Sequence, residues 1–137
     1  MDYKQKVDYL YGYRNAIAKI EGNLDEYERW MTIGEKCTQT IRQDAGGGNS
    51  GEKRIEKAAI MMADIARQID ADTHDAVVKR DDILKTIRTK SRRKRYELFL
   101  EMRFVKGLST YKIAAIIDKD VRTVQRVMRK AIDSLDI

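Results

Sequence analysis

The chain has 137 residues, of which 28 are Lys or Arg and 22 are Asp or Glu, so its formal net charge is +6; charged residues make up 36% of it and aromatic residues 7%. This length suits one domain or two small ones, and the composition favours long solvated helices over a thick globular core. The single cysteine and single histidine exclude an intramolecular disulfide and a Cys/His zinc site. No apolar run is long enough for a signal peptide or a membrane span. We therefore expect a cytoplasmic protein that uses no metal or other cofactor.

The charge is distributed unevenly along the chain. Residues 1–87 hold 14 basic and 16 acidic side chains, a net charge of −2, whereas residues 88–137 hold 14 and 6, a net charge of +8. A positive field confined to the last fifty residues favours an anionic partner for that part. We therefore predict two parts with different roles: a helical hairpin over 1–88 and a basic module over 89–137.

Two segments of the first part carry apolar residues at alternating spacings of three and four. The first stripe comprises Leu10, Tyr13, Ile17, Ile20, Leu24, Tyr27 and Met31, and the second comprises Ile55, Ala58, Met62, Ile65 and Ile69. Such a stripe lies on one side of a helix and packs against a partner helix. The pattern predicts helices over about 4–42 and 52–87, folded into a long antiparallel, coiled-coil-like hairpin with a flexible Gly-rich turn at 43–51.

Two features of this hairpin leave alternatives open. A lone pair of helices buries little area per residue, so a second copy could pack on the same seam and form a homodimer; the sequence does not decide this. Four tyrosines near the N-terminus exceed what one seam uses, and they either cap the end of the hairpin or form a surface for a partner. These are Tyr3, Tyr9, Tyr11 and Tyr13.

The basic part has the pattern of three short helices. The first is expected to begin at the N-cap Ser91 and to end at Gly107. Ser109 and Asp120 are suited to cap the next two helices. A three-residue break separates these two, and Asp118 within it can take the left-handed conformation, so the arrangement is a helix-turn-helix. The last helix carries a buried stripe formed by Val124, Met128, Ala131 and Leu135.

The segment GLSTYKIAAIIDKDVRTVQRVMRKAIDSL resembles the helix-turn-helix of sigma-factor region 4 and of its phage relatives. The residues that fit the apolar and small positions of that motif are Ile113, Ala114, Ile117, Val124 and Val127. By contrast, Asp118 stands where the motif favours Gly, and Lys119 stands where it favours an apolar residue. The expected fold class is therefore all-α: a long antiparallel helical hairpin followed by a three-helix module that resembles sigma region 4.

The whole layout resembles a narrower group. A tyrosine-rich start, YLYGYR, a helical hairpin with a Gly-rich turn and a sigma-like C-terminal module are similar to phage-encoded transcription regulators of the ArpU and RinA type, from phages and prophages of Gram-positive bacteria. This resemblance implies control of late phage genes by DNA binding in the cytoplasm of a bacterial host cell.

With the apolar stripe of the last helix turned inward, its polar and basic side chains face outward. A recognition helix presents its exposed N-terminal residues to base edges in the major groove, where Arg pairs with guanine and Gln with adenine. We therefore predict base reading by Arg122, Gln125 and Arg126. Phosphate contacts position a protein without reading sequence. They are predicted for Thr123, Arg129 and Lys130, for Ser109, Thr110 and Lys112, and for the basic run Arg92, Arg93, Lys94 and Arg95.

These features predict a sequence-specific transcription regulator whose partner is double-stranded DNA, with the hairpin as a dimerisation element or a contact with RNA polymerase. One alternative is a DNA-packaging subunit similar to a phage small terminase, and another is a sigma-like module that occupies RNA polymerase without reading DNA. An enzyme is not expected, because GGGNSG lacks the Lys and the flanking strand of a P-loop and a lone His and Cys build no specific nucleophile–base pair. No membrane partner is expected either.

Overall fold

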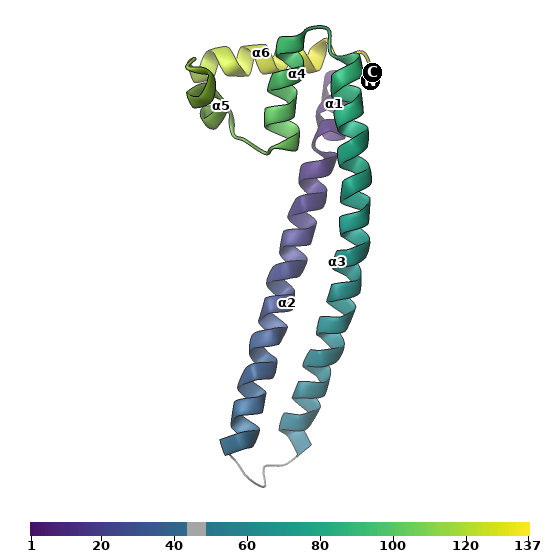
Figure 1. Cartoon of the computed structure of the whole chain (residues 1–137), viewed down its shortest axis with the longest axis vertical. Coiled ribbons are helices and arrows are strands. Elements are labelled where there is room, and N and C mark those ends of the chain that lie inside the picture. Colours follow the sequence, from purple (N-terminus) through teal and green to yellow (C-terminus); the bar gives the residue numbers. More distant parts are fainter. Residues whose placement is uncertain (44–48) are drawn as a thin grey trace. The chain divides into compact units, whose positions relative to one another are not determined.

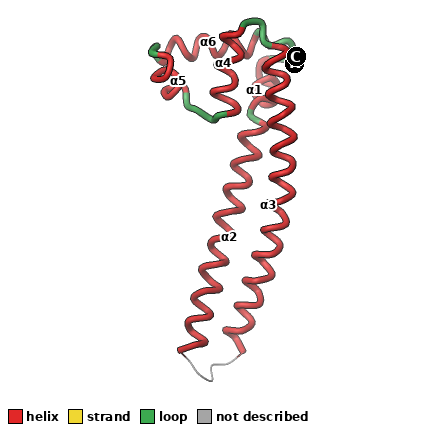
Figure 2. The backbone as a smooth tube through the Cα atoms, in the orientation of Figure 1, coloured by secondary structure: helices red, strands yellow, loops and turns green. Residues whose placement is uncertain are grey.

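The computed structural model describes residues 1–43 and 49–137, and every regular element in this part of the chain is a helix (Figures 1 and 2). In chain order the elements are α1 (Tyr3–Leu10), α2 (Gly12–Gln43), α3 (Asn49–Lys90), α4 (Lys94–Leu100), the π-helical segment η1 (Glu101–Val105), α5 (Thr110–Ile117) and α6 (Val121–Asp133). The predicted all-α fold class is confirmed. Among the described residues, no helix combines the length and the apolar character that crossing a membrane requires.

The described residues group into two compact units. Met1–Ala16 and Asp75–Ile137 together form the first, here called the terminal unit, and Ile17–His74 forms the second, here called the helical pair. This grouping differs from the predicted division at residues 88 and 89. The reason is burial: Leu10 near the N-terminus and Ile83 and Ile87 of α3 are at most 2% exposed and share one hydrophobic core with the C-terminal helices.

The core of the terminal unit draws apolar side chains from each of its helices. Helix α6 packs against α1, α4 and α5. The predicted stripe of the last helix is buried, as expected from its spacing. The buried core residues are Leu10 from α1, Ile83 and Ile87 from α3, Phe99 and Leu100 from α4, Met102 and Phe104 from η1, Ile113 and Ala114 from α5, Val124, Val127, Met128, Ala131 and Ile132 from α6, and Leu135.

The N-terminal helix is shorter than its periodicity predicts, because the chain bends at Tyr11. Helix α1 opens with a capping box in which the Asp2 carboxylate accepts a hydrogen bond from the Gln5 backbone N–H at 2.8 Å, while the Asp2 backbone N–H donates to Gln5 Oε1 at 2.9 Å. Gly12 begins α2 directly after the bend, and glycine is a poor helix former. Leu10, the last residue of α1, is nevertheless buried, as its place in the predicted stripe requires.

The predicted N-cap in the segment between α3 and α4 is wrong. Helix α3 runs on to Lys90, and the Ser91 backbone N–H still donates to the Ile87 carbonyl at 3.3 Å. Helix α4 then begins at Lys94 with Arg93 as its N-cap and without a side-chain cap hydrogen bond. Ser91 is thus not the N-cap of the first C-terminal helix, and its Oγ is buried without a hydrogen-bond partner in the described part of the chain.

In the helical pair, residues 17–43 of α2 and 49–74 of α3 lie side by side (Figure 1). Its seam is thinly packed: Ala58 is 1% exposed, but Leu24 and Met31 of the predicted stripe are 45% and 41% exposed. Beyond the second stripe, the Asp72 carboxylate joins the two helices: it accepts a hydrogen bond from Asn23 Nδ2 at 2.9 Å and lies 3.4 Å from Lys19 Nζ. Much of the predicted Gly-rich turn, residues 44–48, lies outside the described residues, and the structure extends the helices over 43 and 49–51.

Candidate nucleic-acid interface

The link between α5 and α6 is built by three local signals in the sequence. Ser109 caps α5, since its Oγ accepts a hydrogen bond from the Lys112 backbone N–H at 3.2 Å. Asp118 ends α5 in the left-handed conformation with φ 55° and ψ 50°. Asp120 caps α6 by accepting a hydrogen bond from the Thr123 backbone N–H at 3.1 Å, and hydrogen bonds with the side chain and the backbone of Thr123 lower the pKa of the exposed Asp120 carboxyl. The predicted roles of all three residues in the backbone are confirmed.

Helix α6 has two chemically distinct sides. Its buried side consists of the apolar residues that pack in the core, with Val124 and Ala131 wholly inaccessible. The base-reading candidates Arg122, Gln125 and Arg126 are all exposed. Of the phosphate candidates on this helix, Arg129 and Lys130 are exposed and Thr123 is half-buried. The helix thus leaves both sets of candidates accessible on its surface while its other side anchors it.

The candidates at the start of α5 are also accessible. Ser109 and Lys112 are exposed and Thr110 is half-buried, while Ile113 and Ala114 pack inward. Two neighbouring side chains were not among the sequence candidates: Tyr111 is 71% exposed and Ile116 is 63% exposed. Neither side chain belongs to the buried side of α5.

The basic run at the start of α4 is exposed, and it comprises Arg92, Arg93, Lys94 and Arg95. Two of its members lie over aromatic rings: the guanidinium carbon of Arg93 is 5.8 Å from the Tyr96 ring centroid, and that of Arg95 is 5.7 Å from the Phe99 ring centroid. These contacts hold two guanidinium groups close to the helix and offset part of the unfavourable interaction with the helix dipole.

Sequence reasoning missed that α1 packs against the recognition candidate α6. The Lys6 side chain is buried, and its Nζ donates to the Asp133 carbonyl at 2.8 Å, where the positive charge meets the negative end of the α6 dipole. The guanidinium carbon of Arg129 lies 5.4 Å from the Tyr3 ring centroid. The N-terminal tyrosine cluster was the one sequence feature that pointed to this contact. The spacing of its tyrosines did not predict which helix they pack against.

The other tyrosines of this cluster also belong to the terminal unit. The Tyr11 ring packs edge-on against Phe104 at 5.0 Å between centroids. The Tyr9 hydroxyl donates to Asp82 and is hydrogen-bonded to Thr86, and burial together with the Asp82 hydrogen bond raises the pKa of Tyr9. The cluster therefore ties α1 to α3 and η1.

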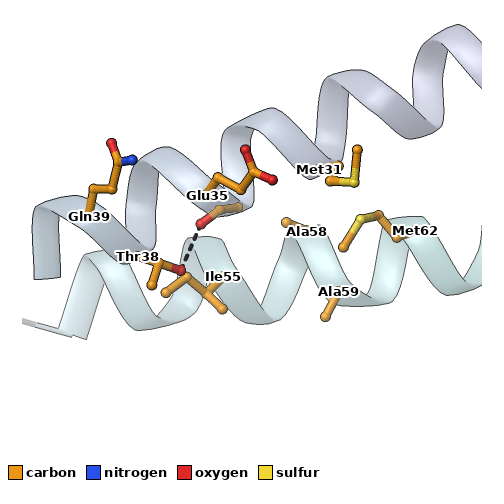
Figure 3. A pocket seen from close by; sticks show the side chains of 9 residues that line it. Met31, Glu35, Thr38, Gln39, Ile55, Ala58, Ala59 and Met62 are labelled. Atoms are coloured by element: carbon orange, nitrogen blue, oxygen red, sulfur yellow. Dashed lines mark hydrogen bonds between the residues drawn. The ribbon is translucent and has the colours of Figure 1, made fainter. Parts of the chain in front are cut away.

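The helical pair holds a groove of about 430 Å³, lined by residues within 31–39 of α2 and 55–62 of α3 (Figure 3). Met31, Ile55 and Met62 supply its larger apolar side chains, and Gly34 allows close approach, because a Cβ there would lie 3.6 Å from Ala58 Cβ. The dashed line in Figure 3 marks the hydrogen bond from Thr38 Oγ1 to the Gly34 carbonyl at 2.9 Å. The polar side chains that line the groove are those of Glu35, Thr38 and Gln39.

Comparison with protein-family models, with curated protein sequences and with solved structures gives no significant match to this chain. The function is therefore inferred from the side chains and the charge of the described residues.

Proposed function

We propose that the chain is a sequence-specific DNA-binding transcription regulator in which α5, the turn at Asp118 and α6 form a helix-turn-helix. The observation that carries the proposal is the two-sided character of α6. One side is locked into the core, and the other offers Arg122, Gln125 and Arg126 at its N-terminal end, where a recognition helix meets base edges. These side-chain types form paired hydrogen bonds with guanine and adenine.

The distribution of charge supports the same proposal. Residues 1–16 and 75–137 of the terminal unit hold 20 basic and 11 acidic side chains, a net charge of +9, whereas residues 17–74 hold 8 and 11, a net charge of −3. The net positive charge is thus confined to the terminal unit. Such a field attracts the phosphate backbone and makes the affinity for DNA dependent on salt.

The proposal is tested by competition gel shifts with the full chain. Gln125→Ala and Arg126→Ala should each reduce the preference for a selected duplex over random DNA by about 1–3 kcal/mol. Arg93→Ala should instead weaken binding to both kinds of duplex equally and flatten the salt dependence. Equal binding of the unmodified chain to selected and random duplexes would reject sequence-specific regulation.

The proposed regulator belongs to a phage or prophage and acts on late genes. This part of the proposal is based on the resemblance to ArpU- and RinA-type regulators. Its helical pair serves as the dimerisation element, since Leu24 and Met31 are more exposed than a two-helix seam needs. Light scattering should report a dimer that Leu24→Glu or Met31→Glu dissociates, with Val77→Glu at a 52% exposed site as the control. A ring of many subunits would favour the DNA-packaging alternative instead.

A second candidate function is binding to RNA polymerase through the sigma-like module. The exposed Tyr111 and Ile116 on α5 favour it, because large apolar side chains at a surface are typical of protein contacts. Retention of purified polymerase by the immobilised chain, and its loss in Tyr111→Ala and Ile116→Ala, would support this function. Polymerase binding and DNA reading are compatible in one protein.

A further inference from the structure

A crevice of about 380 Å³ opens beside the recognition candidate α6, between α1, η1, α5 and α6. The lining residues that carry a polar group are Tyr3, Tyr11, Arg103, Thr110, Gln125 and Arg129. The rest of its lining in the described part of the chain is apolar, and it includes no Asp or Glu. Arg103 and Arg129 therefore both line this crevice, and its lining holds no carboxylate to balance their charge.

Arg103 is anchored at this crevice from η1. Its Nη2 donates to the Tyr11 hydroxyl at 2.7 Å and its Nη1 donates to the Leu108 carbonyl at 3.4 Å, while the guanidinium carbon lies 5.4 Å from the Tyr11 ring centroid. A guanidinium has five N–H donors, so these two bonds leave others to donate into the crevice. The anchoring also reduces the entropy that Arg103 would lose on binding a ligand.

Arg129 is held at the same crevice by a different contact. Its guanidinium carbon lies 5.4 Å from the Tyr3 ring centroid, which restricts an otherwise exposed side chain. Among the described residues, no ion pair joins a carboxylate to Arg103 or Arg129. An arginine pair of this kind suits a phosphate, whose oxygens accept the forked N–H groups.

We propose that the crevice is a phosphate subsite, in which Arg103 and Arg129 bind a backbone phosphate of DNA and Tyr3 positions Arg129. This inference rests on the proposed function. Gln125 lines the same crevice and is a base-reading candidate, and Thr110 is a phosphate candidate at the start of α5. A strand whose bases meet Gln125 therefore passes the crevice. The N-terminal helix thus extends the DNA interface through Tyr3, beyond the helix-turn-helix itself.

The test measures the affinity of the full chain for a selected and a random duplex over a range of salt concentrations. Arg103→Gln and Arg129→Gln should each weaken binding to both duplexes roughly tenfold and reduce the salt slope by about 0.9, the change expected for one phosphate contact. Arg80→Gln is the matched control, because Arg80 lies on α3, pairs with Asp81 and does not line the crevice. Circular dichroism checks folding, and Arg129→Gln changes an exposed side chain, so it keeps the test valid if Arg103→Gln unfolds.

The positioning role of Tyr3 has its own readout. Tyr3→Phe keeps the ring and should bind as the unmodified chain does, whereas Tyr3→Leu should weaken binding about as much as Arg129→Gln. Because both act through one contact, the double variant Tyr3→Leu/Arg129→Gln should be no weaker than Arg129→Gln alone. Additive losses would overturn the positioning role.

Three results overturn the subsite, and they differ in what they say about the proposed function. If the unmodified chain binds DNA and both arginine variants keep its salt slope, the subsite is wrong and the DNA-binding function stands. If calorimetry shows inorganic pyrophosphate bound through Arg103 and Arg129 while no duplex binds, the ligand is a free phosphate compound. If neither pyrophosphate nor duplex binds, the subsite and the proposed function are both wrong.

Discussion

Replacing Leu10 by Ala tests whether α1 belongs to the same cooperative structure as the C-terminal helices. The Leu10 side chain is 0% exposed and lies in one core with Ile83, Ile87 and the buried side of α6. Removing a buried leucine side chain leaves a cavity and costs about 3 kcal/mol. Leu98→Ala makes the same chemical change at a site on α4 that is 52% exposed, where about 1 kcal/mol or less is expected.

Native-state hydrogen exchange is the suitable assay, because it separates the terminal unit from the helical pair. In Leu10→Ala, the opening free energy of the α6 amides should fall by about 3 kcal/mol, whereas in Leu98→Ala it should fall by about 1 kcal/mol or less. If Leu10→Ala lowers the protection of amides within α1 alone and leaves those of α6 protected, then α1 opens independently of the C-terminal helices. That result would refute the assignment of residues 1–16 to the terminal unit.

Three further substitutions test local features of the fold by thermal or urea denaturation. Asp120→Ala should destabilise the chain at neutral pH; because the folded pKa of Asp120 is lowered, this deficit should shrink as the pH falls to about 4 and below, and a deficit independent of pH would contradict the cap. Ser91→Ala should be neutral or up to about 1 kcal/mol stabilising, because it removes a buried unpartnered hydroxyl, and a clear loss of stability would show that Ser91 has a partner. Gly107→Ala should cost more than about 1 kcal/mol, because φ is 73° and the new Cβ would lie 2.5 Å from Arg14 Cζ; an unchanged melting temperature would contradict this geometry.

The parts of the fold that local chemistry determines could be predicted from the sequence. Caps at Ser109 and Asp120 and the left-handed Asp118 follow from side chains that bond their own backbone, and the buried stripe of α6 follows from helical spacing. Local patterns also predicted the exposed side of α6 with Gln125 and Arg126.

The parts that depend on contacts distant in sequence could not be predicted in this way. The Lys6 bond to the Asp133 carbonyl spans almost the whole chain, and nothing in either local pattern indicates it. For the same reason the crevice was missed: its arginines come from η1 and α6, and Tyr3 comes from α1. In the seam of the helical pair, the local periodicity predicts burial, but Leu24 and Met31 are exposed in the single chain.

Selection of bound sequences from a pool of random duplexes, with the full chain, tests the central claim most directly. Reading by α6 predicts one enriched motif for the unmodified chain, with the information at specific positions lost in Gln125→Ala and Arg126→Ala but retained in Arg93→Ala. Recovery of a pool no different from the starting one, or of the same motif from all three variants, would contradict base reading by this helix.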